Sequence, residues 1–295
     1  MKSFISYLER SGKRKNTIKT YITGLKTFIQ WYELKIGKNI EPNTISSLDI
    51  RDYKDYLLNE TDYKVTTINN KLESVKVYLE YLKSINRIKE NPGKKIPLQK
   101  FNRSINVKWL DRNEKNRLLR YIEDPRLEQK NEWRYWRNLT IIYFMLMAGL
   151  RISEVAALTK NDIENGFINI KDGKGGKARK VPMNSDLTHV YMKWLKLSKN
   201  NNSKFLFMSQ KNGQLTADGI QHLFRTIRNE TGLSITPHTL RHTFCHDLIE
   251  KGASINYVAE VAGHSDIDTT KIYIAPSESE VRNVVEMLSS GKFRK

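Results

Sequence analysis

Six side chains that could act on a phosphodiester occur in order along this chain. Five carry basic nitrogen groups that can donate hydrogen bonds and the sixth is a phenol: Arg151, Lys174, His238, Arg241, His264 and Tyr273. Basic donors stabilise the charge that spreads onto the non-bridging oxygens during phosphoryl transfer. A tyrosine nucleophile forms a covalent intermediate, which conserves the energy of the broken bond for rejoining. The series therefore indicates cleavage and exchange of DNA strands.

Three histidines also allow a metal-binding interpretation. His238, His242 and His246 are spaced four residues apart on one predicted helix, and helical histidine pairs at that spacing can bind zinc. Arg241 lies between them and would repel a cation, and no cluster of carboxylates or cysteines completes the site. The sequence therefore favours a site without metal or other cofactor, in which His242 and His246 are structural.

The composition is strongly basic. Lysine and arginine number 51 against 32 aspartate and glutamate residues, which gives a net charge of +19 and a pI near 9.8. The excess occurs in both halves of the chain, which favours a protein that surrounds a polyanion over one with a single basic tail. Basic balance alone also fits RNA or an anionic membrane surface.

The sequence shows no membrane or secretion signal. Its longest apolar run, residues 141–150, is much shorter than the roughly 20 residues of a membrane span. The N-terminus lacks the apolar core of a signal peptide. The single cysteine, Cys245, excludes an intrachain disulfide and is typical of a reducing compartment. We therefore expect a cytoplasmic protein without a membrane partner.

Hydrophobic periodicity predicts two domains that are mainly α. Residues 1–92 contain apolar residues at helical spacing and end at a Pro-Gly break. Residues 93–108 contain one proline and several basic residues without apolar periodicity, and we interpret them as a basic interdomain linker. The second domain, residues 109–295, is predicted to be mainly α with one small sheet.

The second domain opens with Asp111, a predicted N-cap for its first helix. Strands are predicted at 167–170 and 179–182 and form a small antiparallel sheet. The turn between them is rich in glycine and lysine. Helices are predicted on both sides of this sheet in the sequence.

Two long helices of the first domain have polar faces that could contact DNA. They are predicted near residues 17–32 and 67–85. Amides and hydroxyls read base edges in a major groove, and lysines hold phosphates. An ordinary solvated face has the same composition, and the residues alone do not decide between the two. The candidate contacts are Lys15, Lys19, Thr23, Asn70 and Ser74, with Lys177 in the second domain.

Five ordered motifs resemble those of the tyrosine recombinase (phage integrase) family. The motifs are Ala148-Gly149-Leu150-Arg151-Ile152-Ser153-Glu154, Gly173-Lys174-Gly175-Gly176-Lys177, His238-Thr239-Leu240-Arg241-His242, Ala262-Gly263-His264-Ser265 and Thr269-Thr270-Lys271-Ile272-Tyr273. Their order and spacing match, and the resemblance covers nearly the whole chain. The departures are Ala262, where the family often has leucine, and Ile274-Ala275 after the tyrosine. Neither removes a functional group.

The resemblance implies a fold and a type within the family. It implies a helical, SAM-like core-binding domain followed by the catalytic domain. The two would clamp double-stranded DNA at a specific recombination site. Because the chain begins almost directly with the core-binding helices, we expect a simple Xer-like or transposon-resolvase type without the arm-binding module of larger phage integrases.

The resemblance also implies roles for the basic residues. Arg151 and Arg241 would clamp the phosphate, and Glu154 would orient Arg151. Lys174 would protonate the leaving 5′ oxygen as a general acid. The alternative is that Lys174, or Lys177 beside it, only touches backbone phosphate.

The remaining roles concern the nucleophile. Tyr273 would attack the phosphorus, and its phenol, with an ordinary pKa near ~10, needs surrounding positive charge or a base. His238 would donate to the phosphate and could accept the proton of Tyr273. His264 would donate to the second non-bridging oxygen.

Two classes of function fit these residues. The first is a site-specific recombinase that works through a 3′-phosphotyrosyl intermediate, with a type IB topoisomerase as a related alternative. The second is a non-catalytic DNA-binding protein on the same scaffold, which the intact set of six residues disfavours. Integration, excision and resolution all use this chemistry, so the biological role stays open.

The C-terminal tail carries an apolar stripe. Val281, Val284, Val285 and Leu288 recur at helical spacing in a helix predicted at 277–289. Packing on its own domain is one interpretation. The resemblance implies another, in which the helix docks on a neighbouring protomer and closes a tetramer on two DNA sites in the nucleoid.

Overall fold

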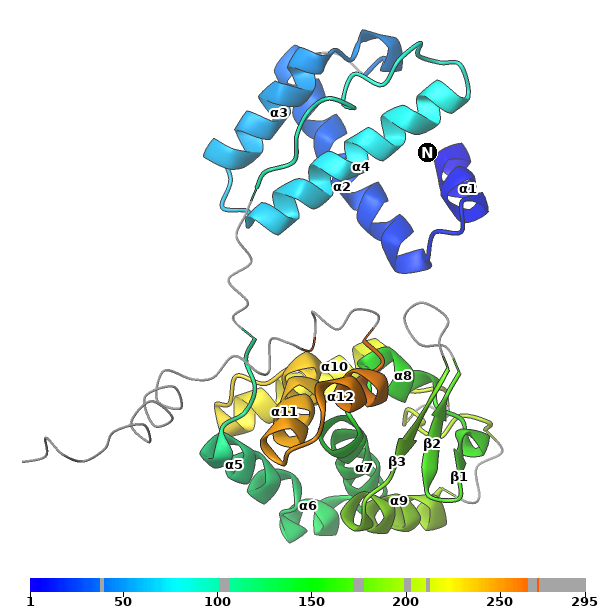
Figure 1. The fold of residues 1–295 in the computed structure, drawn as a ribbon, viewed down its shortest axis with the longest axis vertical. Coiled ribbons are helices and arrows are strands. Elements are labelled where there is room, and N and C mark those ends of the chain that lie inside the picture. The colour runs from blue at the N-terminus through cyan, green and yellow to red at the C-terminus, as the bar shows by residue number, and fades with distance from the viewer. Residues whose placement is uncertain are drawn as a thin grey trace, which may run out of the picture. The chain divides into compact units, whose positions relative to one another are not determined.

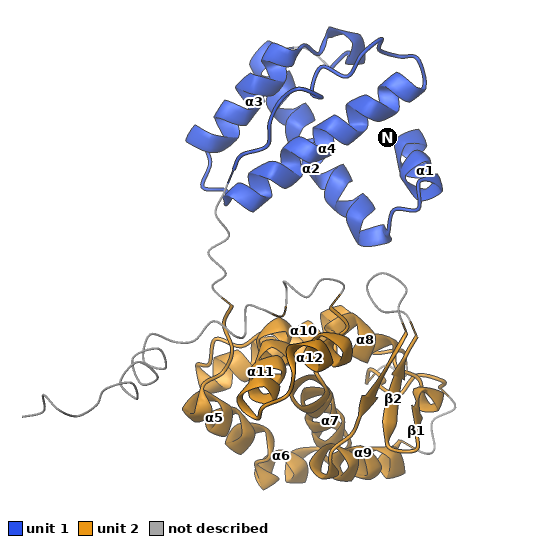
Figure 2. Ribbon diagram, viewed as in Figure 1, with its two compact units in different colours: residues 1–104 blue, residues 105–295 orange. Residues whose placement is uncertain are grey.

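The chain forms two compact units, residues 1–104 and 105–295, which are coloured separately in Figure 2. The computed structural model describes residues 1–37, 40–100, 107–171, 178–198, 203–210, 213–264 and 270. The predicted site residues Lys174, Lys177 and Tyr273 and the predicted helix at 277–289 lie outside these ranges. No helix in the described part of the chain is long and apolar enough to cross a membrane.

The first unit is a helical bundle (Figure 1). Its core pair is α2 and α4, which pack against each other, and α1 and α3 contact this pair. Apolar residues at three- and four-residue spacing, such as Leu25, Phe28, Leu72 and Val75, are fully buried between them. The elements are α1 (Lys2–Arg10), α2 (Lys15–Ile36), the 3-10 turn η1 (Pro42–Thr44), α3 (Ser47–Asn59) and α4 (Val65–Ser84).

α2 and α4 approach closely where two small residues face each other. A Cβ added to Gly24 on α2 would lie 2.3 Å from the Ser74 Oγ on α4. Ser74 is fully buried, and its hydroxyl donates to the carbonyl oxygen of Asn70 at 2.7 Å. The prediction that Ser74 contacts DNA is therefore wrong, because helix packing removes its side chain from the surface.

The first part of the predicted linker, 93–108, packs on the first unit. Ile96 is only 3% exposed and belongs to the core of that unit. The side chain of Asn69 donates to the Gln99 carbonyl at 2.9 Å and accepts from the Gln99 amide at 2.8 Å. The boundary between the units follows residue 104. Ile96 and Gln99, which the sequence assigns to the linker, thus contact the first unit.

The second unit is mainly helical with one small antiparallel sheet, as predicted. Its strands pair in the order β1 (Ile163–Glu164), β2 (Phe167–Ile170) and β3 (Arg179–Pro182), with Ile168 opposite Val181. Its helical elements are α5 (Arg112–Ile122), α6 (Pro125–Lys130), α7 (Glu132–Ala148), α8 (Ile152–Ala157), the 3-10 turn η2 (Lys160–Asp162), α9 (Ser185–Leu197), α10 (Ala217–Thr231), α11 (Pro237–Glu250) and α12 (Ile255–Ala262). The predicted fold class is therefore confirmed.

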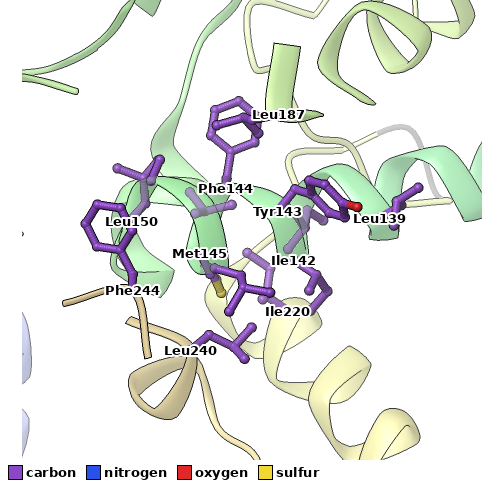
Figure 3. Packing of buried hydrophobic residues seen from close by; sticks show 14 of the residues in the cluster. Leu139, Ile142, Tyr143, Phe144, Met145, Leu150, Leu187, Ile220, Leu240 and Phe244 are labelled. Carbon is purple, nitrogen blue, oxygen red and sulfur yellow. The ribbon is translucent and has the colours of Figure 1, made fainter. Parts of the chain in front are cut away.

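α7 lies in the hydrophobic core of the second unit (Figure 3). Its residues Phe144 and Met145 are fully buried, and the helix packs on α9 and α11. α7 ends at Gly149, which has a left-handed φ of +63°. A Cβ on Gly149 would also lie 2.3 Å from Cδ1 of Phe244 on α11. Backbone conformation and packing both require glycine here, and the turn delivers Arg151.

Two residues of the second unit that precede α5, Trp109 and Leu110, contact α11. The Leu110 amide donates to the Thr243 hydroxyl at 2.9 Å in a buried position. The Trp109 ring stacks on the His246 ring with 4.4 Å between centroids. These contacts hold the helix that carries His238 and Arg241.

Candidate active site

Arg151 is the N-cap residue of α8 and follows the turn at Gly149. Its side chain is 18% exposed. Nη1 donates to Glu154 Oε1 at 2.7 Å, and Nη2 donates to the Gly263 carbonyl at 2.6 Å. These bonds use two of the five N–H groups of a guanidinium, so the side chain is held in place and can donate to a further anion.

Glu154 is buried behind Arg151. Its carboxylate accepts from the Arg151 amide at 2.8 Å and from Arg151 Nη1. It also accepts from Arg179 Nη1 at 2.9 Å and Nη2 at 2.8 Å. Burial alone would raise the pKa of Glu154, but the hydrogen bonds and charges of Arg179 and Arg151 outweigh it and lower the pKa to about 2. Glu154 is therefore ionised and contacts Arg151 as the predicted orienting role requires.

Arg179 was not predicted as a site residue. It is the first residue of β3, and its side chain lies with that of Val181 on the buried face of the strand. Its side chain is 5% exposed and forms a two-point ion pair with Glu154. The sequence contains one signal for it, an arginine at an inward-facing strand position, since a buried charge requires a partner.

Arg241 is the second buried arginine of the site, with 4% of its surface exposed. Nη1 donates to the Gly149 carbonyl at 2.6 Å, and Nη2 donates to the Ala262 carbonyl. Burial, followed by the charge of Arg151, lowers the pKa of Arg241 to about 10. It is still protonated at neutral pH and joins the end of α7 to the end of α12.

Three arginines bind consecutive carbonyl oxygens at the C-terminal end of α12. Arg179 Nε donates to Val261 at 2.8 Å, Arg241 to Ala262 and Arg151 to Gly263. The last carbonyls of a helix have no partner within the helix and carry partial negative charge. The end of α12 therefore gathers the arginines and fixes the residue that follows, His264.

His264 is anchored on its other side by Thr270, which is fully buried. The His264 Nδ1 lies 2.8 Å from the Thr270 Oγ1. Burial, followed by the charges of Arg241 and Arg151, lowers the pKa of His264 to about 3, so the ring is neutral at pH 7. In the tautomer in which Thr270 donates to Nδ1, the Nε2–H group is a hydrogen-bond donor.

His238 and His242 lie one turn apart on α11, with ring centroids 6.3 Å apart. Partial burial, followed by the charges of Arg241 and Arg151, lowers the pKa of His238. Burial, followed by His238 and Arg241, lowers the pKa of His242 to about 4. His238 is thus neutral at pH 7 and lies within electrostatic reach of Arg241 and Arg151. The structure brings together four of the six predicted residues, while Lys174 and Tyr273 lie outside the described ranges.

One group of possible metal ligands occurs among the described residues. It comprises His246, Asp247 and Glu250, whose ligand atoms lie within 4.8 Å of one another. Asp247 forms an ion pair with Lys115, and His246 stacks on Trp109. The set differs from the histidine triplet considered from the sequence, and its side chains already have protein partners.

The first unit has a shallow hollow of about 310 Å³ between α2 and α4. Three predicted DNA contacts, Lys19, Thr23 and Asn70, line it and are exposed. Lys71 also lines the hollow and donates to the Thr27 hydroxyl at 2.9 Å. The other lining residues are Thr20, Gly24 and Thr67. Lys15 is exposed at the start of α2.

The sequence models of one family match both units. The model described as the phage integrase family matches residues 108–280. The model of the phage integrase N-terminal SAM-like domain matches residues 1–87. Together they cover most of the chain.

Several relatives match over nearly their whole length. The TnP I resolvase of Bacillus thuringiensis is 31% identical, covering 97% of this chain and 99% of the relative. The tyrosine recombinase XerD of Oceanobacillus iheyensis is 28% identical, covering 93% and 92%. A structure of the Tn1549 transposon integrase in complex with a circular intermediate DNA has a TM-score of 0.71 at 21% identity, covering 97% and 98%, which shows the shared fold. The chain belongs to the phage integrase family.

Proposed function

We propose that this chain is a site-specific DNA recombinase that works through a 3′-phosphotyrosyl intermediate. The observation that carries the proposal is the convergence of Arg151, Arg241 and His264 at the end of α12. Tyr273 follows Thr270 by three residues, and three residues of chain span at most about 11 Å. Because Thr270 is hydrogen-bonded to His264, the proposal requires Tyr273 to act on a phosphate within that reach of Thr270.

The proposed cleavage exchanges one ester bond for another. The Tyr273 oxygen attacks phosphorus, the bond from phosphorus to the 5′ oxygen breaks, and Lys174 protonates that oxygen. The phosphate remains on the 3′ oxygen of the cleaved strand and is now also esterified to Tyr273. Attack by a 5′-hydroxyl of another strand reverses these steps, so bond energy is retained and the reaction as written uses no cofactor.

The arginines supply the electrostatic part of catalysis. Arg151 and Arg241 are already fixed by carbonyl oxygens, and Arg151 also by Glu154. Donors that are already fixed need little reorganisation when charge develops on the phosphate. For this reason preorganised sites stabilise transition states. Arginine forks also match two phosphate oxygens at once.

The histidines serve proton transfer and hydrogen bonding. His238, kept neutral by partial burial and by Arg241 and Arg151, has a lone pair that can take the proton of Tyr273. His264, also neutral, donates to a non-bridging oxygen through Nε2–H. Because neutral imidazole is required at His238, the cleavage rate should fall as the pH drops below the His238 pKa.

The test is recovery of covalently attached DNA from cells. We expect rapid denaturation to yield DNA attached to the chain, with one common sequence at the cleavage point. Attached DNA without a common sequence would favour the topoisomerase alternative. No attached DNA from folded protein that binds DNA would favour a non-catalytic DNA-binding protein.

The hollow between α2 and α4 is the proposed DNA-reading surface of the first unit. Replacing Lys19 with glutamine should weaken binding to all duplexes and reduce the slope of log K against log salt by about 0.9, the value for one lost phosphate contact. Arg51, which is exposed on α3 outside the hollow, is the matched control, because Arg51→Gln removes the same charge. Equal salt slopes for the two variants in gel-shift titrations would contradict this surface.

We also propose that the tail docks on a neighbouring copy to close a tetramer on two DNA sites in the nucleoid. A helix as short as the one predicted at 277–289 is marginal alone, so its apolar stripe requires a partner surface. Truncation after Ser277 should leave binding of one site intact and reduce cooperative binding of two sites about 10-fold or more, within the gain that linked sites give. Unchanged cooperativity and full recombination would show that the tail serves its own unit.

A further inference from the structure

Arg179 belongs to the buried part of the site. Its side chain and that of Glu154 are each 5% exposed, while that of Arg151 is 18% exposed. Arg179 and Glu154 are therefore equally buried, and Arg151 is the most exposed of the three. An anion that binds Arg151 from solvent would be separated from Arg179 by the Glu154 carboxylate.

Arg179 fixes two parts of the site at the same time. Its two terminal nitrogens hold both oxygens of Glu154, and its Nε holds the Val261 carbonyl at 2.8 Å. Its guanidinium also packs against Gly263, where an added Cβ would lie 3.0 Å from Nη1. The Gly263 carbonyl oxygen accepts a hydrogen bond from Arg151 Nη2, and Gly263 precedes His264. The Arg179 side chain thus supports both Arg151 and the segment that leads into His264.

The charges of the cluster give Arg179 a second effect. Glu154 carries a full negative charge beside Arg151, since its pKa is well below neutral. Two arginines and one glutamate sum to one positive charge. Without Arg179 the net charge would be zero, and the Glu154 carboxylate would neutralise the neighbouring Arg151. This effect is large because charges interact more strongly in a buried site than in water.

We propose that Arg179 is a positioning residue for cleavage, which keeps Arg151 and His264 in place and keeps Arg151 electropositive without touching DNA. The inference rests on the proposed function. Arg179 acts through Glu154 and the end of α12, so its loss should affect the chemical step and leave DNA affinity nearly unchanged.

The experiment uses full-length variants and a nicked duplex that carries the chain's own recovered site. The variants are Arg179→Met, Arg179→Lys, Glu154→Gln and the double variant Arg179→Met/Glu154→Gln. Single-turnover adduct formation is measured with saturating protein on a scissile phosphate and on a neutral methylphosphonate. The methylphosphonate lacks the negative charge that Arg151 neutralises.

On the phosphate, Arg179→Met should slow cleavage about 100-fold, the scale of a misplaced catalytic group. On the methylphosphonate the loss should shrink to less than about 10-fold, because less charge needs stabilisation. The double variant should cleave the phosphate faster than Arg179→Met, because removing the Glu154 charge leaves Arg151 positive. Arg179→Lys should fall between wild type and Arg179→Met.

Two results would overturn the inference. One is cleavage of the phosphate by Arg179→Met at close to the wild-type rate. The other is an equal loss on both substrates, with no gain in the double variant, which would make Arg179 a residue of stability only. If Arg179→Met does not fold, as judged by its thermal transition, the same comparison of substrates with Arg179→Lys decides. Wild type that forms no adduct at all would refute the proposed function instead.

Discussion

Replacing Tyr273 with phenylalanine is expected to abolish covalent capture of DNA. The substitution removes one oxygen and leaves the ring, so a nucleophile is lost without a change in charge. DNA affinity should stay within about 2-fold of wild type, because affinity depends mainly on phosphate contacts with lysine and arginine. The measurement is the yield of slowly migrating adduct from a nicked suicide duplex in a denaturing gel, together with a gel-shift titration of the same DNA.

Tyr257 provides the matched control for that experiment. It is an exposed tyrosine on α12, 44% accessible, in the same unit as the site. Tyr257→Phe should give full adduct yield. An undiminished adduct from Tyr273→Phe would refute the assignment of the nucleophile, and a loss of adduct in both variants would show that the effect is not specific to Tyr273.

Arg241→Lys is expected to slow cleavage by about 100-fold or more, the scale of losing one preorganised donor in a transition state. Arg241 reaches the Gly149 and Ala262 carbonyls with two nitrogens. A lysine keeps the charge but has one nitrogen on a flexible stem. The lysine therefore cannot keep both hydrogen bonds to the Gly149 and Ala262 carbonyls, and its charge is no longer held in a fixed position at the end of α12. Single-turnover adduct formation at saturating protein measures the effect.

Arg137 is the control for a general effect of changing a partly buried arginine. Its Nη1 donates to the Met208 carbonyl at 3.0 Å, and its guanidinium lies 5.0 Å from the centre of the Trp133 ring. Burial, followed by the charge of Arg134, lowers the pKa of Arg137 to about 10, as for Arg241. Arg137→Lys should alter thermal stability without a loss of cleavage rate. A rate for Arg241→Lys equal to that of the control variant would contradict the clamp role.

Local signals were enough to predict most helices and strands. Asp111 is the N-cap of α5, and it forms a capping box with Glu114 as its sequence setting indicates. Gly149 ends α7 in a left-handed conformation next to Arg151. In both places the chemistry of one or two adjacent residues decides the backbone, so the sequence contains the necessary information.

Other boundaries depend on contacts between distant segments. α2 begins at Lys15, with Arg14 as N-cap, earlier than the helix predicted near residues 17–32. Periodicity placed Ser74 on the polar side of α4, but the depth of burial depends on how closely α2 approaches, and Gly24 allows that approach. A pattern within one helix does not contain the distance to its neighbour.

The candidate site shows the same division. Arg151, Arg241 and His264 stand out in the sequence because they occur in ordered motifs, and the structure places all three at the end of α12. Arg179 lies in a strand without such a motif, and its importance follows only from the three-dimensional contact with Glu154. Residues that position other residues are recognised by their partners, which are far apart in the sequence.

The chemical structure of the covalent adduct tests the central claim most directly. The adduct can be digested with protease and nuclease and the attached peptide identified by mass spectrometry, while the released DNA strand is tested for a 5′-hydroxyl by enzymatic labelling. We expect a nucleotide joined through its 3′-phosphate to Tyr273, and a free 5′-hydroxyl on the other product. Attachment to another residue, or a 5′-phosphate linkage, would contradict the proposed mechanism.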